Sequence, residues 1–121
     1  MRTILDGLVT TVNGPVQPLS WAYEPDVAKY EFDPAKSNAM LDAAGWRRGA
    51  DAERTKDGMP LAFTLITQAG FTIRENVAQA LQKQFKDVGV RVQVKLLDGT
   101  AISPVWFSGE FDAMLHWWQQ G

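Results

Sequence analysis

The chain has 121 residues, of which 45% are hydrophobic and 21% charged, and its net charge is −2. This size predicts a single domain over residues 1–121 that buries about 65% of its unfolded surface, and the weak charge excludes a basic surface for nucleic acid or for anionic lipid. The chain has no cysteine, which excludes thiolate chemistry and cysteine-ligated metals. No apolar run approaches ~20 residues, the length that a helix needs to span a membrane, so no direct membrane span is expected.

Residues 1–32 are expected to form an extended arm within this domain. Glycine and proline interrupt every apolar run there before a helix could nucleate, at Gly7, Gly14, Pro15, Pro18 and Pro25. The arm also carries aromatic residues that require a surface to lie on, namely Trp21, Tyr23, Tyr30 and Phe32.

A helix is predicted at about residues 34–44. Asp33 is suited to the N-cap, Pro34 to the first helical position and Gly45 to the position after the end. The following polar stretch, residues 47–58, is expected to be a solvated loop that ends in an Asp-Gly turn. Its basic residues are interpreted as a solvated surface: Arg47, Arg48, Arg54 and Lys56.

Residues 61–97 predict a right-handed βαβ unit. The stretch LAFTLIT (61–67) is apolar on both faces and therefore predicts a central strand. A Thr72–Glu75 capping box begins an amphipathic helix that ends at Gly89. The stretch VRVQVKLL (90–97) alternates apolar and polar residues, as a strand with one buried face does. The fold class is therefore α/β with a parallel βαβ core.

The last part of the chain predicts a short helix and a third strand. Ser103 would cap a helix at about residues 103–107, and Gly109 would end it. FDAMLHWW (111–118) then alternates as a strand, which places Trp117 on the core face and Trp118 on the opposite face. Trp118 would lie at the carboxyl end of a strand in an α/β sheet, where ligands collect, and is therefore a candidate site residue.

A catalytic interpretation has little support. Asp112 and His116 would lie ~13 Å apart along a strand, beyond hydrogen-bond reach. No nucleotide-binding glycine loop or nucleophile motif occurs, and one histidine without cysteine does not predict a zinc site. We therefore expect no enzyme, no metal and no cofactor. The helix start at Thr72 could attract an anion, but capping explains it more simply.

Three passages of the sequence together resemble a known family. They are YEFDPAKSNAMLDAAGW, LQKQFKDVGVRV and the FD before the last strand, within an order of segments that spans nearly the whole chain. The chain resembles the extracytoplasmic solute-binding proteins of peptide-type ABC importers, family 5, of the dipeptide- and oligopeptide-binding type.

The resemblance implies one lobe of a larger two-lobe, periplasmic-binding-protein-like fold. Such proteins are not enzymes; they enclose a peptide or related small solute and deliver it to a membrane permease. It implies a periplasmic or extracytoplasmic location, with the signal sequence absent from these residues. One wall of the cleft would be formed by Trp118, Gln119, Trp117 and Phe71.

The resemblance leaves the solute open. Relatives with this lobe carry peptides, opines, nickel chelates, glutathione or oligosaccharides. The alternative interpretation is a stand-alone small α/β regulatory or protein-interaction module whose aromatic end would be a dimer interface.

Overall fold

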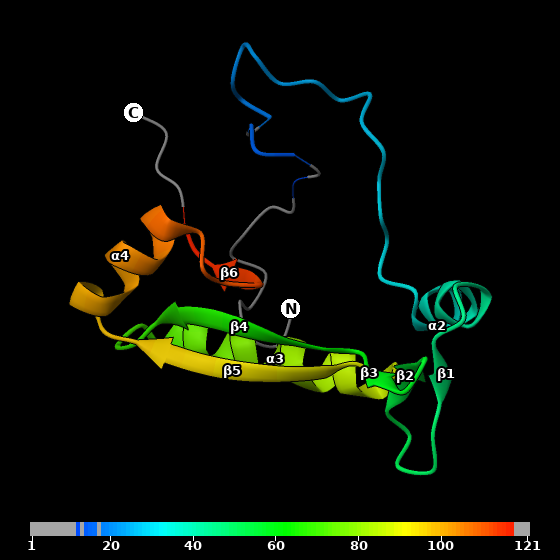
Figure 1. Cartoon of the computed structure of the whole chain (residues 1–121). Coiled ribbons are helices and arrows are strands. Elements are labelled where there is room, and N and C mark those ends of the chain that lie inside the picture. Colours follow the sequence, from blue (N-terminus) through cyan, green and yellow to red (C-terminus); the bar gives the residue numbers. More distant parts are fainter. Residues whose placement is uncertain (1–11, 13, 17, 118–121) are drawn as a thin grey trace.

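The computed structural model describes residues 12, 14–16 and 18–117. Its helices are α2 (Pro34–Ala43), α3 (Thr72–Asp87) and α4 (Gly99–Ser108). Its strands are β1 (Arg47–Arg48), β2 (Arg54–Lys56), β3 (Met59–Pro60), β4 (Ala62–Gln68), β5 (Arg91–Leu97) and β6 (Ala113–Leu115). Figure 1 shows that α2 and strands β1, β2 and β3 lie at one end of the molecule, and α4 at the other.

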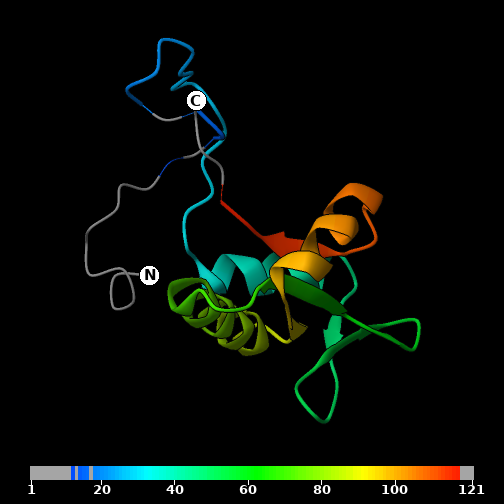
Figure 2. The ribbon, with the colours of Figure 1, turned by 90° about the vertical axis from the view of Figure 1, so that its left-hand side faces the viewer.

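The main sheet is parallel and has the order β5-β4-β6. Leu65 of β4 lies opposite Val94 of β5 and Ala113 of β6. The prediction of a central strand is therefore confirmed, and so is the order strand, helix, parallel strand. Helices α3 and α4 lie on opposite sides of this sheet (Figure 2), which explains why β4 is apolar on both faces.

The core lies between the sheet and α3. Its buried residues are Leu65, Ala78, Val88, Val90 and Val92. Phe63 of β4 and Phe85 of α3 extend it with an edge-to-face contact at 5.3 Å between ring centroids. This packing fixes α3 along β4 and β5, so the start of α3 lies near the carboxyl ends of both strands.

The predicted helix at residues 34–44 is confirmed as α2. The Asp33 carboxylate accepts a hydrogen bond from the Lys36 amide at 3.1 Å, as an N-cap does. Gly45 follows with φ +90°, a left-handed conformation that glycine adopts without strain. The N-cap, the first-position proline and the glycine were sufficient to place this helix.

The prediction for residues 47–58 is only partly right: the Asp57–Gly58 turn is present and most of the stretch is exposed, but it is not a loop, and Arg54 is buried. These residues and the following Met59 and Pro60 form a small antiparallel sheet of the order β1-β2-β3. Arg54 is only 1% exposed, because its guanidinium bonds to groups from α2, the α2–β1 turn and the α3–β5 turn. Those partners are scattered along the sequence, so local composition could not reveal them.

Helix α4 begins earlier than predicted. Asp98 is its N-cap and accepts hydrogen bonds from the Thr100 and Ala101 amides at 2.9 and 2.8 Å. Ser103, the expected cap, therefore lies inside the helix. These bonds and the Thr100 hydroxyl lower the pKa of Asp98, the hydroxyl most of all. Gly109 ends the helix with φ +73°, as expected.

Residues 18–32 contain no helix or strand and extend away from the main sheet (Figure 1). Trp21, Tyr30 and Phe32 are 97%, 90% and 77% exposed, so the described part of the chain does not provide the surface that these aromatic residues were expected to cover. Within the described residues, no helix combines the length and apolar character needed to cross a membrane.

Candidate ligand-binding site

The candidate site lies where strands β4 and β6 end and helix α3 begins. Parallel strands direct their carboxyl ends to one edge of the sheet, and ligands of open α/β sheets bind at that edge. Phe71 follows β4 and precedes α3, and Trp117 lies two residues after the end of β6. Chain topology therefore brings together two aromatic residues that are far apart in sequence.

Arg74 joins these two aromatic residues. Its guanidinium carbon lies 4.2 Å from the centroid of the Phe71 ring and 5.5 Å from that of the Trp117 ring. Both distances are within the range of cation–π attraction. Phe71 is 44% exposed and Trp117 49% exposed, so both rings retain free surface. The three side chains form what we call the aromatic–arginine cluster.

The aromatic rings of the cluster give the guanidinium of Arg74 no hydrogen-bond acceptor, and one of its nitrogens is buried. Nη1 is buried, and no described residue accepts a hydrogen bond from it. A buried charged donor without an acceptor costs free energy. Such a group at the edge of a binding surface indicates that a ligand atom could supply the acceptor.

The start of α3 adds further donors to this region. The predicted capping box is wrong, because the N-cap is Phe71 and no side chain caps the helix. Glu75 instead accepts a hydrogen bond from the Gly70 amide at 2.9 Å, in the turn before the helix. The first-turn amides of a helix carry a partial positive charge. The region is therefore electropositive apart from the Glu75 carboxylate.

The four predicted ligand-binding residues fall into two groups. Phe71 and Trp117 lie together in the cluster, whereas Trp118 and Gln119 lie outside the described residues. The prediction that Trp117 packs in the core is wrong, because β6 ends at Leu115 and Trp117 lies beyond the core on Arg74. Its neighbours follow the predicted alternation: Leu115 packs against the core, while Met114 lies on the α4 side.

Arg74 was missed from the sequence, although one signal pointed to it. A cation in the first turn of a helix opposes the helix dipole, which makes an arginine at that position unfavourable by about 0.3–1 kcal/mol. One partner, Phe71, lies only three residues earlier in the sequence, whereas the other, Trp117, comes from a distant segment that no local pattern indicates.

Asp112 and His116 make separate structural contacts. The Asp112 carboxylate accepts a hydrogen bond from the Thr64 amide at 3.0 Å, beside the start of β6. The His116 ring lies on Trp106 of α4, with the centroids 4.9 Å apart. Trp106 is 40% exposed and also stacks on Phe111, so it is only partly buried. These contacts explain both residues without a catalytic role.

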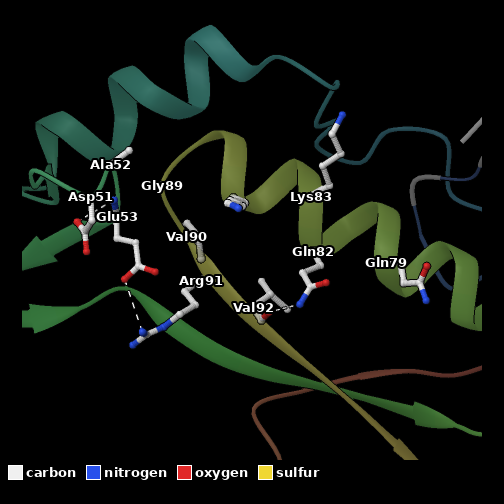
Figure 3. A pocket seen from close by; sticks show the side chains of 11 residues that line it. Asp51, Ala52, Glu53, Gln79, Gln82, Lys83, Gly89, Val90, Arg91 and Val92 are labelled. Atoms are coloured by element: carbon white, nitrogen blue, oxygen red, sulfur yellow. Dashed lines mark hydrogen bonds and ion pairs between the residues drawn. The ribbon is translucent and has the colours of Figure 1, made fainter.

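A separate groove of about 580 Å³ lies near the amino end of β5, between α3 and residues 51–53 (Figure 3). Its charged residues have both signs, and Glu53 pairs with Arg91 at 3.7 Å. Gln82 donates a hydrogen bond to the Val92 carbonyl at 2.9 Å. These three side chains already have partners, and no aromatic residue lines the groove, so it is a weaker candidate site than the aromatic–arginine cluster.

Comparison with known proteins identifies the family. Residues 1–121 match the bacterial extracellular solute-binding proteins, family 5 middle region. The chain belongs to this family. Oligopeptide-binding protein AppA of Bacillus subtilis is 36% identical over 123 residues, which cover 95% of this chain and 22% of AppA. Oligopeptide-binding protein OppA of Lactococcus lactis is 34% identical over 92 residues, which cover 74% of this chain and 15% of OppA.

Two solved structures contain the same fold. AppA in complex with a nonapeptide superposes with a TM-score of 0.84 at 32% identity, over 97% of this chain and 25% of AppA. NikZ of Campylobacter jejuni in complex with Ni(L-His) gives a TM-score of 0.82 at 25% identity, over 95% of this chain and 23% of NikZ. The predicted fold class, one lobe of a periplasmic-binding-protein-like fold, is confirmed. The chain spans only about a quarter or less of these relatives.

Proposed function

We propose that this chain forms one wall of the cleft in the solute-binding component of an ABC importer, which captures peptides or related small solutes for transmembrane uptake. The observation that carries the proposal is the aromatic–arginine cluster at the carboxyl ends of β4 and β6, in a chain that matches family 5 over residues 1–121. Exposed aromatic rings and a few directed polar groups are typical of ligand-binding surfaces.

Phe71 and Trp117 would stack on the solute, and Arg74 would supply charged donors. Trp118 and Gln119 would continue the wall along the chain after Trp117. A second lobe would close over the solute, because one exposed wall leaves most of a ligand in water and makes few convergent contacts.

The wider role follows from the family. Family 5 consists of extracellular solute-binding proteins, and we infer that this chain binds its solute without transforming it. We infer an extracytoplasmic location and delivery of the solute to a membrane permease of the importer. The family match over the whole chain favours this role over that of a stand-alone regulatory or protein-interaction module.

The solute class is proposed from the relatives. AppA and OppA are named oligopeptide-binding proteins, and AppA was solved with a nonapeptide, whereas NikZ was solved with Ni(L-His). The higher identity to AppA favours a peptide for this chain, and the nickel–histidine complex is the second candidate.

Calorimetric titration of the full-length protein, as its gene encodes it, tests the proposal. We expect saturable binding of di- to pentapeptides and a loss of about tenfold in affinity for Phe71→Ala or Trp117→Ala, which corresponds to ~1.4 kcal/mol. Trp118→Ala should weaken binding similarly. Phe107→Ala is the matched control, because Phe107 is 86% exposed on α4 and belongs to a different surface.

The absence of binding for every peptide at millimolar concentration would contradict the peptide assignment and direct the search to Ni(L-His). Peptide binding that Phe71→Ala and Trp117→Ala leave unchanged would contradict the proposed wall and place the peptide on another surface.

A further inference from the structure

Arg74 occupies an electrostatically unfavourable position. It is the third residue of α3, in the turn where the helix dipole places partial positive charge. A lysine or arginine is favoured at the opposite end of a helix, where Lys86 lies in the last turn of α3. The location of Arg74 therefore calls for an explanation other than helix stability.

The described residues do not neutralise Arg74. Their ion pairs join Arg54 to Asp42 and Arg91 to Glu53, and neither includes Arg74. The nearest acid in sequence, Glu75, accepts a hydrogen bond from the Gly70 amide. The buried Nη1 of Arg74 has no acceptor among the described residues. The cation is thus held in place by aromatic rings and lacks an anion.

The surroundings of Arg74 favour a planar anion. The Phe71 and Trp117 rings approach the guanidinium without offering it a hydrogen-bond acceptor. A guanidinium binds a carboxylate through two parallel N–H···O bonds, a geometry that an ammonium or an amide does not reproduce. The first-turn amides of α3, which no side chain caps, would add to the attraction for a negative charge.

We propose that Arg74 determines specificity by pairing with a carboxylate of the solute. This inference rests on the proposed function, because it assigns one chemical group of the solute to one residue of the binding wall. The carboxylate could be the carboxyl terminus of a peptide or an acidic side chain. The ring contacts would hold the guanidinium in place while the solute enters.

Three synthetic pentapeptides distinguish these sources when titrated into the full-length protein. The first has neutral side chains and a free carboxyl terminus, the second is its carboxyl-terminal amide, and the third is the amide with one glutamate. The variants are Arg74→Gln, which removes the charge, and Arg74→Lys, which keeps the charge but removes the planar fork. Arg91→Gln is the matched control, because its side chain is 56% exposed on β5 outside the cluster.

We expect the wild-type protein to bind the free-acid peptide at least tenfold more tightly than its amide. Arg74→Gln should reduce the affinity for the acid to that for the amide, Arg74→Lys should give an intermediate value, and Arg91→Gln should retain the wild-type ratio. Recovery of affinity with the glutamate peptide would assign the contact to an acidic side chain instead of the carboxyl terminus.

The inference fails, and the proposed function stands, if peptides bind but Arg74→Gln weakens the acid and the amide equally. It also fails if the wild-type protein does not distinguish either carboxylate from the neutral amide. If none of the three peptides binds, both the peptide assignment and this inference are overturned. Circular dichroism and the thermal midpoint of each variant show whether a loss of binding reflects loss of fold.

Discussion

Arg54 and Arg74 lie near opposite ends of helix α3 and have opposite surroundings. Arg54 is 1% exposed and donates to the Val88 carbonyl through Nε at 2.7 Å, at the end of α3. Its other nitrogens donate to the Asp42 and Asn38 side chains and to the Trp46 carbonyl. Arg74, in the first turn, contacts two aromatic rings and leaves Nη1 without an acceptor among the described residues.

The difference shows how one residue type serves two purposes. The protein supplies every contact that Arg54 requires, and these contacts tie α2 and the small sheet to the end of α3. The hydrogen bond from Arg54 lowers the pKa of Asp42, which favours the charged form of the pair. A satisfied guanidinium stabilises the fold, whereas an unsatisfied one remains available to a ligand.

The largest expected effect is that of Arg54→Met on stability. The substitution preserves apolar volume but removes the donors to the Val88 and Trp46 carbonyls and to Asn38. We expect a loss of about 3 kcal/mol in the free energy of unfolding. Thermal and denaturant unfolding of the full-length protein measure it.

The control for Arg54→Met is Arg91→Met. The ion pair of Arg91 with Glu53 is long, at 3.7 Å, and partly exposed, so we expect a change below ~0.5 kcal/mol. Equal losses in the two variants would contradict the assignment of Arg54 as the residue that joins these elements.

A pair of glycines tests how rigidly Arg54 is held. Gly89 has φ +86°, and a Cβ there would lie 2.7 Å from Cγ of Arg54 and 3.1 Å from the Ala52 carbonyl oxygen. Gly70 has a similar φ of +89° but open space around it. Backbone strain alone predicts a loss of about 1 kcal/mol for Gly70→Ala. We expect Gly89→Ala to lose about twice as much, because Arg54 cannot move without losing its hydrogen bonds.

Unfolding midpoints of the two glycine variants, compared with wild type, measure this difference. If Gly89→Ala and Gly70→Ala lose the same stability, the Arg54 side chain adapts easily, and the contrast between a fixed and an available arginine becomes weaker.

The sequence predicted those parts of the fold that local patterns determine. Alternation and helical spacing located β4, α3 and β5, and Asp33 with Pro34 located the start of α2. It failed at residues 47–58, because the burial of Arg54 depends on acceptors contributed by distant segments. It also failed at α4, where the Asp98 cap lies five residues before the expected Ser103.

The candidate site was predictable only in part. Phe71 and Trp117 were proposed, and the structure places both against one guanidinium. Arg74 was missed because its contact with Trp117 joins the start of α3 to the segment after β6, which are 40 or more residues apart by number. In a parallel sheet, crossover connections bring segments that are distant in sequence to the same edge. The residues that meet there share no local sequence pattern.

The smallest expected effect is that of Arg74→Gln on stability, and it provides the sharpest contrast with Arg54. Loss of the two ring contacts would cost about 0.5–1 kcal/mol each at a partly exposed site. Removal of the unfavourable charge from the first turn of α3 would raise the free energy of unfolding by about 0.3–1 kcal/mol. Removal of an unpaired buried donor would raise it by a further ~1 kcal/mol. We therefore expect a net change within ~0.5 kcal/mol in the same unfolding measurements. A loss as large as that of Arg54→Met would show that Arg74 is a structural residue, and its pairing with a solute carboxylate would then lose its main support.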